Sequence, residues 1–167
     1  ENNDPNKIIK HLVPKYAHES SVKLVRLACH LRDIPQIIPC TKYLKDRGYL
    51  IGFNVMQASE LTNNDVELLC KLFNEFPVDV VYFADSMGSM YPNDVINISR
   101  EFKKNWDGPI GIHTHDNIGL AMQNTLSAIE NGITWIDTTV AGMGRGPGNA
   151  KTEEMLVELK ESFNKNL

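Results

Sequence analysis

Five short apolar segments rich in β-branched residues recur along the chain, about 30 residues apart, which is the length of one βα unit. They cover residues 22–28, 49–55, 78–84, 108–113 and 134–140. Apolar residues occupy both odd and even positions in these segments, which is typical of strands buried on both faces. The pattern therefore predicts a parallel sheet of five strands, covered on both sides.

Helical periodicity fills the intervals between these segments. Helices are predicted at 5–17 with an end near Pro14, at 34–47, from Thr62 to Pro77, from Pro92, from about 117 to 131, and at 152–163. For the helix at 34–47, Asp33 is the expected N-cap, Pro35 stands in the first turn and Gly48 ends it. Strands that alternate with helices in this way indicate an α/β fold.

Two architectures accommodate these units in a single domain over residues 1–167. One is a complete flavodoxin-like sheet, doubly wound with helices on both faces. The other is a five-strand arc of a TIM (β/α)8 barrel, a fold that needs about 250 residues in all. Both place active-site residues at the carboxyl ends of the strands. An arc would leave two open sheet edges, from which we expect a homo-oligomer.

Composition and charge mainly exclude functions. The formal net charge is −4, so the chain lacks the basic surface that nucleic acid or an anionic membrane requires, and neither is expected as a partner. No apolar run is long enough to span a bilayer, and the first residues do not resemble a signal peptide. Cys29, Cys40 and Cys70 are far apart and form no CxxC pair, which favours reduced thiols and a cytoplasmic location.

The fourth apolar segment runs into GPIGIHTHDNIGLA (108–121), in which His113 and His115 stand two residues apart. On a strand their side chains point to the same face, with Cα atoms roughly 6.5–7 Å apart, so the two imidazoles can share one divalent ion. Two hydrogen-bonded histidines at a strand end are the alternative. Asp116 and Asn117 fit either a site or the cap of the following helix.

The last apolar segment leads into a glycine-rich loop, AGMGRGPGNAKTEE (141–154). Such a loop lets backbone N–H groups approach a bound carboxylate or phosphate, and barrels often place anion sites after their last two strands. Arg145 offers a guanidinium for a substrate carboxylate. The alternatives are a tight turn that needs positive φ and a solvent-facing arginine. The loop is not a Walker A motif.

Two earlier strands also end in polar residues. The third ends in ADSMGSM (84–90), which brings Asp85 and Ser86 within reach of a ligand, although Asp at a strand end is also a common turn residue. The first ends in RLACH, which offers Arg26 and His30 on one side of the strand. Polar residues at the ends of four of the five strands together favour a functional site there.

Three segments in this order and spacing resemble the pyruvate-type metal-dependent aldolases and lyases, a family of (β/α)8 barrels. They are DSMG (85–88), HTHDNIGLA (113–121) and IDTTVAGMGRGPGNAKTEEML (136–156). The family includes 4-hydroxy-2-oxovalerate aldolase, hydroxymethylglutaryl-CoA lyase and the isopropylmalate and homocitrate synthases. The resemblance covers about residues 22–160 and implies that the five strands are strands four to eight of a barrel.

The resemblance also implies roles for individual residues. By role they are the metal ligands His113, His115 and Asn149, the substrate-binding residues Ser86, Gly144, Arg145 and Gly146, and the catalytic residues His30 and Asp85. The implied cofactor is a divalent metal ion, Mn²⁺ in the first place, with Mg²⁺, Co²⁺ or Zn²⁺ as alternatives. VRLACH followed by DSMG is closer to the aldolases than to the synthases, and the loop lacks the reactive cysteine of the lyase branch.

The same resemblance implies that the chain lacks the first three βα units of the barrel. In the family, these units carry an acidic third metal ligand and a neighbouring catalytic arginine, and residues 1–21 contain no substitute motif. The chain also ends after the last barrel helix. A dehydrogenase partner, which some of these aldolases contact through a C-terminal extension, is therefore not favoured.

The function that follows from the resemblance is aldol cleavage. A divalent-metal-dependent aldolase would cleave a 4-hydroxy-2-oxo acid to pyruvate and an aldehyde through a metal-stabilised enolate. The base for the 4-hydroxyl proton would be His30 or a residue of the missing segment. Two alternatives remain open, an acetyl-CoA-dependent acyltransferase acting on a 2-oxo acid, and a non-catalytic flavodoxin-like binding domain.

Overall fold

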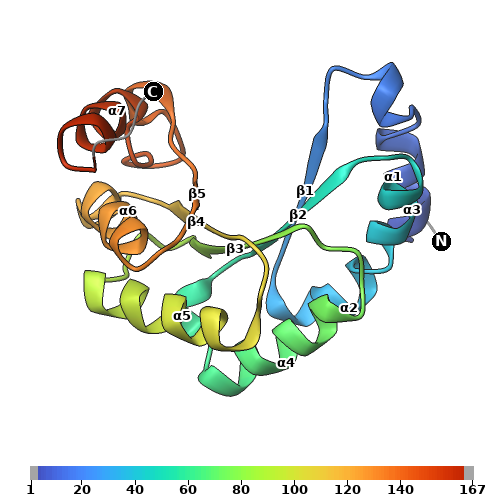
Figure 1. Cartoon of the computed structure of the whole chain (residues 1–167), viewed down its shortest axis with the longest axis horizontal. Helices are drawn as coiled ribbons and strands as arrows, with labels where there is room; N and C mark the ends of the chain where they lie inside the picture. The colour runs from blue at the N-terminus through green and yellow to red at the C-terminus, as the bar shows by residue number, and fades with distance from the viewer. Residues whose placement is uncertain (1–3, 164–167) are drawn as a thin grey trace.

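The computed structural model describes residues 4–163, in which the apolar segments and helical patterns alternate as βα units (Figure 1). The strands are β1 (Leu24–Cys29), β2 (Leu50–Val55), β3 (Val80–Asp85), β4 (Ile110–Thr114) and β5 (Trp135–Ile136). The helices are α1 (Pro5–Leu12), α2 (Ile34–Ile37), α3 (Cys40–Asp46), α4 (Asn63–Asn74), α5 (Pro92–Asn105), α6 (Ala121–Glu130) and α7 (Thr152–Glu161).

The strand order distinguishes the two architectures. Each strand pairs in parallel with its neighbours in the sequence, in the order β1-β2-β3-β4-β5. A flavodoxin-like sheet has the order 2-1-3-4-5, because its connections reverse direction once and place helices on both faces. Here the helices follow the outer side of a curved sheet (Figure 1). The predicted arc of a barrel is confirmed, while the flavodoxin-like alternative and the expected helical cover on both sides are wrong.

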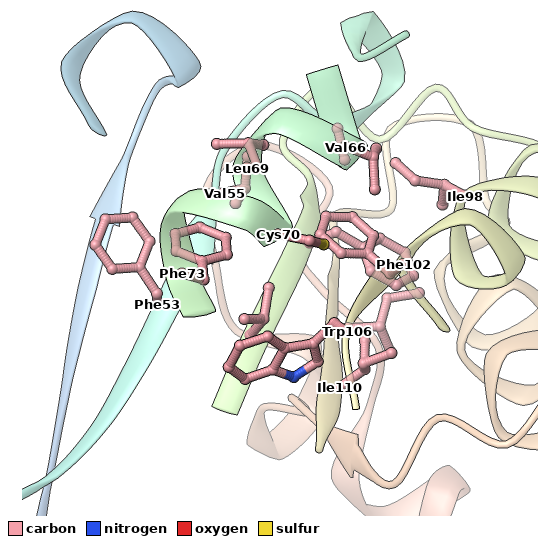
Figure 2. Close-up of a cluster of buried hydrophobic side chains, with 14 of the residues drawn as sticks. Phe53, Val55, Val66, Leu69, Cys70, Phe73, Ile98, Phe102, Trp106 and Ile110 are labelled. Carbon is pink, nitrogen blue, oxygen red and sulfur yellow. The ribbon is translucent and has the colours of Figure 1, made fainter. Parts of the chain in front are cut away.

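The hydrophobic core lies between the outer face of the sheet and the helices α4 and α5. Figure 2 shows Phe53 of β2 beside Phe73 of α4, with Phe102 of α5 and Trp106, the residue after α5, nearby. The Phe53 and Phe73 ring centroids are 5.0 Å apart, and Phe83 of β3 stacks on Phe102 at 5.8 Å. These four phenylalanine side chains are fully buried. Burial of so much aromatic surface fixes the helices against the strands.

The inner face of the same strands has a different composition. It carries small and polar residues, such as Ala28 on β1, Asn54 on β2, Ala84 on β3 and His113 on β4, which line one cavity. Side chains along a strand point alternately to opposite faces, so residues next to each other in the sequence lie on different faces of the sheet. The inner face at the carboxyl ends of the strands is where a ligand has room to bind.

Two helix boundaries agree with the sequence and one does not. Thr62 caps α4 through a reciprocal pair of hydrogen bonds with Asp65, and Pro92 begins α5. The predicted helix 34–47 is interrupted, because Pro39, which has no N–H to donate, separates α2 from α3. Asp33 has helical backbone angles and forms no side-chain capping hydrogen bond. Asp33 occupies the predicted N-cap position of α2, but its side chain does not cap the helix because the chain already turns at Leu31–Asp33.

The last two units are shorter than predicted. α6 begins at Ala121 rather than near residue 117, because the Asp116 carboxylate accepts a hydrogen bond from the Ala121 N–H at 2.8 Å and Gly119 adopts a positive φ of 76°. β5 contains only Trp135–Ile136 instead of 134–140, because Thr139 forms a bridge with Lys151 rather than pairing with β4. The polar segment after β5 thereby becomes part of a loop.

All three cysteines are buried and free. Burial, with a smaller contribution from a nearby carboxylate, raises the pKa of the Cys29 and Cys70 thiols to about 12, so neither is a reactive thiolate. Cys40 and Cys70 both pack in hydrophobic core clusters. Within residues 4–163, no helix is long and apolar enough to cross a membrane. The cytoplasmic location stays a prediction.

Candidate active site at the carboxyl ends of the strands

A cavity of about 300 Å³ opens at the carboxyl ends of β1 to β4. Its lining comes from all four strands or the loops that follow them, together with one residue of the glycine-rich loop: Ala28, His30, Asn54, Met56, Gln57, Ala84, Ser86, Met87, His113, His115 and Arg145. Five of the nine predicted site residues are in this set. Of the remaining four, Asp85 is the last residue of β3, and Gly144, Gly146 and Asn149 belong to the glycine-rich loop.

His113 and His115 both line the cavity, as their spacing on a strand predicts. Their ring centroids are 5.0 Å apart and the rings are nearly perpendicular. The Nδ1 atom of His113 lies 3.0 Å from Oδ2 of Asp137, whereas Nδ1 of His115 is buried without a hydrogen-bond partner in the described part of the chain. Burial, followed by the nearby positive charges of His113 and Arg145, lowers the pKa of His115. His115 therefore favours the neutral form, which is the form that binds metals.

The glycine-rich loop folds back onto the histidine strand and delivers Asn149. His115 and Asn149 form an antiparallel bridge, and the Asp116 N–H donates to the Gly148 carbonyl at 2.9 Å. A Cβ at Gly148 would overlap the Gly142 carbonyl oxygen, so only glycine allows this closure. The Asn149 amide donates to the Met143 carbonyl at 3.1 Å, which fixes the side chain.

Gly144 and Gly146 have different surroundings in this loop. A Cβ at Gly144 would overlap the Asn149 side-chain nitrogen, so Gly144 makes room for Asn149. Gly146 has a positive φ of 61°, and a methyl group added to its Cα would meet no atom within 4 Å, so it faces open space. The substrate-binding roles of both glycines stay predictions.

Asp85 and Ser86 organise the loops around the cavity. Both Asp85 carboxylate oxygens accept backbone hydrogen bonds, from Ser89 at 3.0 Å and Met90 at 3.1 Å, and the residue is only 1% exposed. The Ser86 hydroxyl accepts from the Gln57 N–H at 2.9 Å, and the Ser86 carbonyl accepts from Arg145 at 2.6 Å. These contacts are those of a turn-forming aspartate and a loop-bridging serine, and the catalytic and substrate-binding roles stay predictions.

Several buried polar atoms at the site have no partner among residues 4–163. They are Nδ1 of His30, Oδ1 of Asn54, Nδ1 of His115 and Oδ1 of Asn149. An unsatisfied buried acceptor costs about 1–3 kcal/mol, so native proteins keep few of them. Three of the four belong to cavity-lining residues, His30, Asn54 and His115, so a ligand or water bound in the cavity would supply missing partners.

Two site residues were missed by sequence reasoning. Asp137, directly after β5, contacts His113, and Asn54 on β2 lines the cavity. An aspartate within an apolar segment is a detectable signal, because a charged residue in a buried strand requires a partner. Asn54 stands in LIGFNV at the same kind of position. Both were hidden because their segments otherwise read as ordinary strands.

The potential metal ligands at the site are of a chemical type that binds divalent ions. Across residues 4–163, no group of three or more His, Cys, Asp or Glu side chains is arranged to hold a metal. Two imidazoles and the unpartnered amide oxygen of Asn149 nevertheless form a nitrogen and oxygen donor set on adjoining segments. Such donors suit Mn²⁺, Co²⁺ or Zn²⁺.

Comparisons with known proteins agree with this assembly. The chain is 38% identical over 144 residues to 4-hydroxy-2-oxovalerate aldolase of Carboxydothermus hydrogenoformans, which is 86% of this chain and 43% of that protein. It is 35% identical over 144 residues to the enzyme of the same name from Geobacillus genomosp. 3, covering 86% and 42%. The chain thus spans less than half the length of these curated relatives.

Solved structures show the same fold. The N-terminal domain of a candidate aldolase from Bacteroides vulgatus is 29% identical, with a TM-score of 0.81 over 99% of this chain and 63% of that chain. HMG-CoA lyase of Bacillus subtilis is 19% identical, with a TM-score of 0.75 over 87% and 58%, and shows likeness of fold alone.

The site brings together a histidine pair, a glycine-rich loop with its asparagine, and a polar cavity at the strand ends. The model of the HMGL-like family matches residues 20–165, which is nearly the whole chain. With this match and the shared fold, the chain belongs to the HMGL-like family.

Proposed function

We propose that this chain carries the part of a divalent-metal-dependent aldolase active site that contains the metal-binding histidines. The substrate is a 4-hydroxy-2-oxo acid, and the products are pyruvate and an aldehyde. The observation that carries the proposal is the convergence of His113, His115 and Asn149 beside the cavity, with buried polar atoms of His115 and Asn149 lacking partners in residues 4–163. The relatives named 4-hydroxy-2-oxovalerate aldolase support the reaction class.

The proposed metal ligands are His113, His115 and Asn149, and Mn²⁺ is the first candidate ion. A divalent ion bound there would supply Lewis-acid polarisation of the substrate's 2-oxo group. The family resemblance implies one more ligand, an acidic residue, and a catalytic arginine, both after the first barrel strand. We propose that they come from residues outside this chain.

The chain's own residues hold the substrate around that point. Arg145 lines the cavity, and its guanidinium is placed to pair with the substrate carboxylate in addition to the Ser86 carbonyl. His30 lines the same cavity with an unpartnered buried Nδ1 in the described chain, and this atom is the proposed acceptor for the 4-hydroxyl proton. Asp85 holds the loop that presents Ser86, which makes Asp85 a positioning residue in this proposal.

Calorimetric titration of the chain with MnCl₂ tests the metal site. We expect binding in the micromolar range that is lost in His113→Ala and His115→Ala. His11→Ala, an exposed histidine of α1, is the matched control and should bind like the parent chain. Equal Mn²⁺ binding by the His113→Ala and His11→Ala variants would overturn the assigned ligands.

A product assay tests the reaction. The chain is mixed with Mn²⁺ and racemic 4-hydroxy-2-oxopentanoate, and pyruvate is measured over time. Release of pyruvate that depends on His113 supports the aldolase. Thiol release from acetyl-CoA with a 2-oxo acid, in place of pyruvate release, would replace it with the acyltransferase alternative.

A further inference from the structure

An arginine crosses the whole inner face of the sheet. Arg26 lies on β1, at one edge, and its guanidinium donates at 2.5 Å to Oδ2 of Asp137, which follows β5 at the other edge. The two residues are 111 positions apart in the sequence. Their side chains are 32% and 20% exposed, so the ion pair is partly accessible to solvent. No strand pairing brings these two residues together, because β1 and β5 do not share a ladder.

Two glycines make this crossing possible. A Cβ at Gly52 of β2 would lie 3.2 Å from Cγ of Arg26, and a Cβ at Gly111 of β4 would overlap the Tyr82 ring. Arg26 in turn lies over the Tyr82 ring, with its Cζ 4.6 Å from the ring centroid. The glycines on β2 and β4 thus leave space for the side chains of Arg26 and Tyr82. The stacked guanidinium gains a cation–π contact as well as its ion pair.

The far end of this crossing is a histidine of the site. The same Oδ2 atom of Asp137 that accepts from Arg26 lies 3.0 Å from Nδ1 of His113. The ion pair with Arg26 favours the ionised form of this carboxyl. A carboxylate only accepts hydrogen bonds, so the proton of a neutral His113 must be on Nδ1, which leaves the Nε2 lone pair free.

We propose that Asp137 and Arg26 are positioning residues for His113. Asp137 fixes the Nδ1–H tautomer, so that Nε2 is the atom offered to the metal, and Arg26 holds Asp137 in place. The metal part of this inference rests on the proposed function, whereas the tautomer part does not. Neither residue touches the metal or the substrate in this assignment.

The order of the contacts explains why a charge on β1 matters to a ligand on β4. Metal-bound histidines usually donate their second ring N–H to a carboxylate or carbonyl, and removal of that partner typically weakens metal affinity about 10- to 100-fold. Within residues 4–163 no carboxylate hydrogen-bonds to His115, and the Gly148 backbone is the group that contacts its ring. Of the two histidines, His113 is therefore the one oriented by a carboxylate.

Nitrogen-15 NMR of the metal-free chain tests the tautomer directly. The spectrum is recorded at about pH 8, above the ordinary histidine pKa of about 6.5, on protein labelled at its five histidines. We expect His113 to carry its proton on Nδ1 in the parent chain. In Asp137→Asn the amide N–H is able to donate to Nδ1, so the proton should move to Nε2. A parent His113 protonated on Nε2 would overturn the proposal.

Calorimetry with MnCl₂ tests the consequence for metal binding. Asp137→Asn should bind Mn²⁺ about 10- to 100-fold more weakly than the parent chain. Arg26→Met should show a smaller loss, and Arg26→Lys, which keeps the charge, should recover part of it. Lys45→Met is the matched control, because Lys45 pairs with Asp79 at 2.7 Å in a comparable ion pair outside the cavity. It should change neither the His113 tautomer nor the Mn²⁺ affinity.

The failures of the two proposals are distinguishable. If the parent chain binds no Mn²⁺ but His113 carries its proton on Nδ1 and loses it in Asp137→Asn, the metal site fails and the positioning role stands. If Mn²⁺ binds and depends on His113, but Asp137→Asn and Lys45→Met have equal tautomers and affinities, the positioning role is wrong and the metal site stands. Thermal unfolding of each variant by circular dichroism shows that the compared chains are folded.

Discussion

The two faces of the sheet use the same strands for different purposes. On β3, Phe83 points to the helices and stacks on Phe102, whereas Tyr82 lies on the inner face beneath Arg26. On β4, Ile112 belongs to the core cluster, whereas His113 lines the cavity. Large apolar side chains fill the outer face. The inner face carries mainly glycine, alanine and polar residues, together with the Tyr82 ring. Two adjacent residues of one strand therefore serve different purposes, one in the core and the other at the candidate site.

This difference predicts that substitutions on the outer face change stability and leave the chemistry of the folded protein intact. The inner face should show the reverse, with modest changes in stability and large changes in binding. The largest effect on the free energy of unfolding is expected for the aromatic core.

Phe83→Ala removes a fully buried ring that stacks on Phe102 at 5.8 Å. We expect the free energy of unfolding to fall by about 3–5 kcal/mol, because transfer energy is lost and a cavity is left. Urea unfolding followed by circular dichroism measures this loss. The folded fraction should bind Mn²⁺ as the parent chain does, and a changed affinity would break the separation between the faces.

Gly111→Ala introduces a methyl group that overlaps the Tyr82 ring on the inner face. The ring and the guanidinium stacked on it have to move, at a cost of about 1–3 kcal/mol in stability. Displacement of Arg26 should also weaken Mn²⁺ binding, by calorimetry. Gly52→Ala is the graded control, since its methyl meets only the flexible Arg26 stem at 3.2 Å. Equal effects of the two substitutions would contradict this account of the crossing.

Thr62→Ala removes the cap of α4 on the outer side and should cost about 0.5–2 kcal/mol at neutral pH without any change in Mn²⁺ affinity. The hydrogen bonds from the Thr62 hydroxyl and N–H hold the pKa of Asp65 below its ordinary value. A depressed carboxyl pKa contributes stability above the unfolded value of about 3.9, and the contribution is lost as the pH falls through the lower folded value.

The difference between Thr62→Ala and the parent chain should therefore shrink below about pH 4. Urea unfolding at neutral and at acidic pH checks this. Asp65→Asn provides the control, since it lacks the titrating group and should show little dependence on pH over the same range. A difference that grows in acid would show that another group governs the capping contact.

Much of the fold was predictable because it depends on repeated local patterns. The five strands and the start of α4 at Thr62 follow from the spacing of apolar residues and from helix-start signals. The sheet order was not predictable from periodicity, since flavodoxin-like and barrel arrangements share the same units. The break at Pro39 was overlooked although proline lacks the N–H that a continuous helix needs.

The site was predictable only where its residues cluster in the sequence. His113 and His115 are two apart, and Asn149 follows a conspicuous glycine run. Asp137 and Asn54 were missed because they join the site through tertiary contact from within apolar segments. The pairing of Arg26 with Asp137 depends on the curvature of the sheet and on space left by Gly52 and Gly111. Local patterns carry no information about such a crossing.

The long sequence separation within the Arg26–Asp137 pair also bears on the order of folding. Neighbouring strands pair across roughly one βα unit, and Asp137 and His113 are only 24 residues apart, whereas Arg26 and Asp137 are separated by 111. Loop-closure entropy delays contacts of such long range until shorter ones have formed. We therefore expect the sheet to assemble before the guanidinium reaches its carboxylate. The His113–Asp137 contact should form with the last βα unit, and Arg26 should fix it only late in folding.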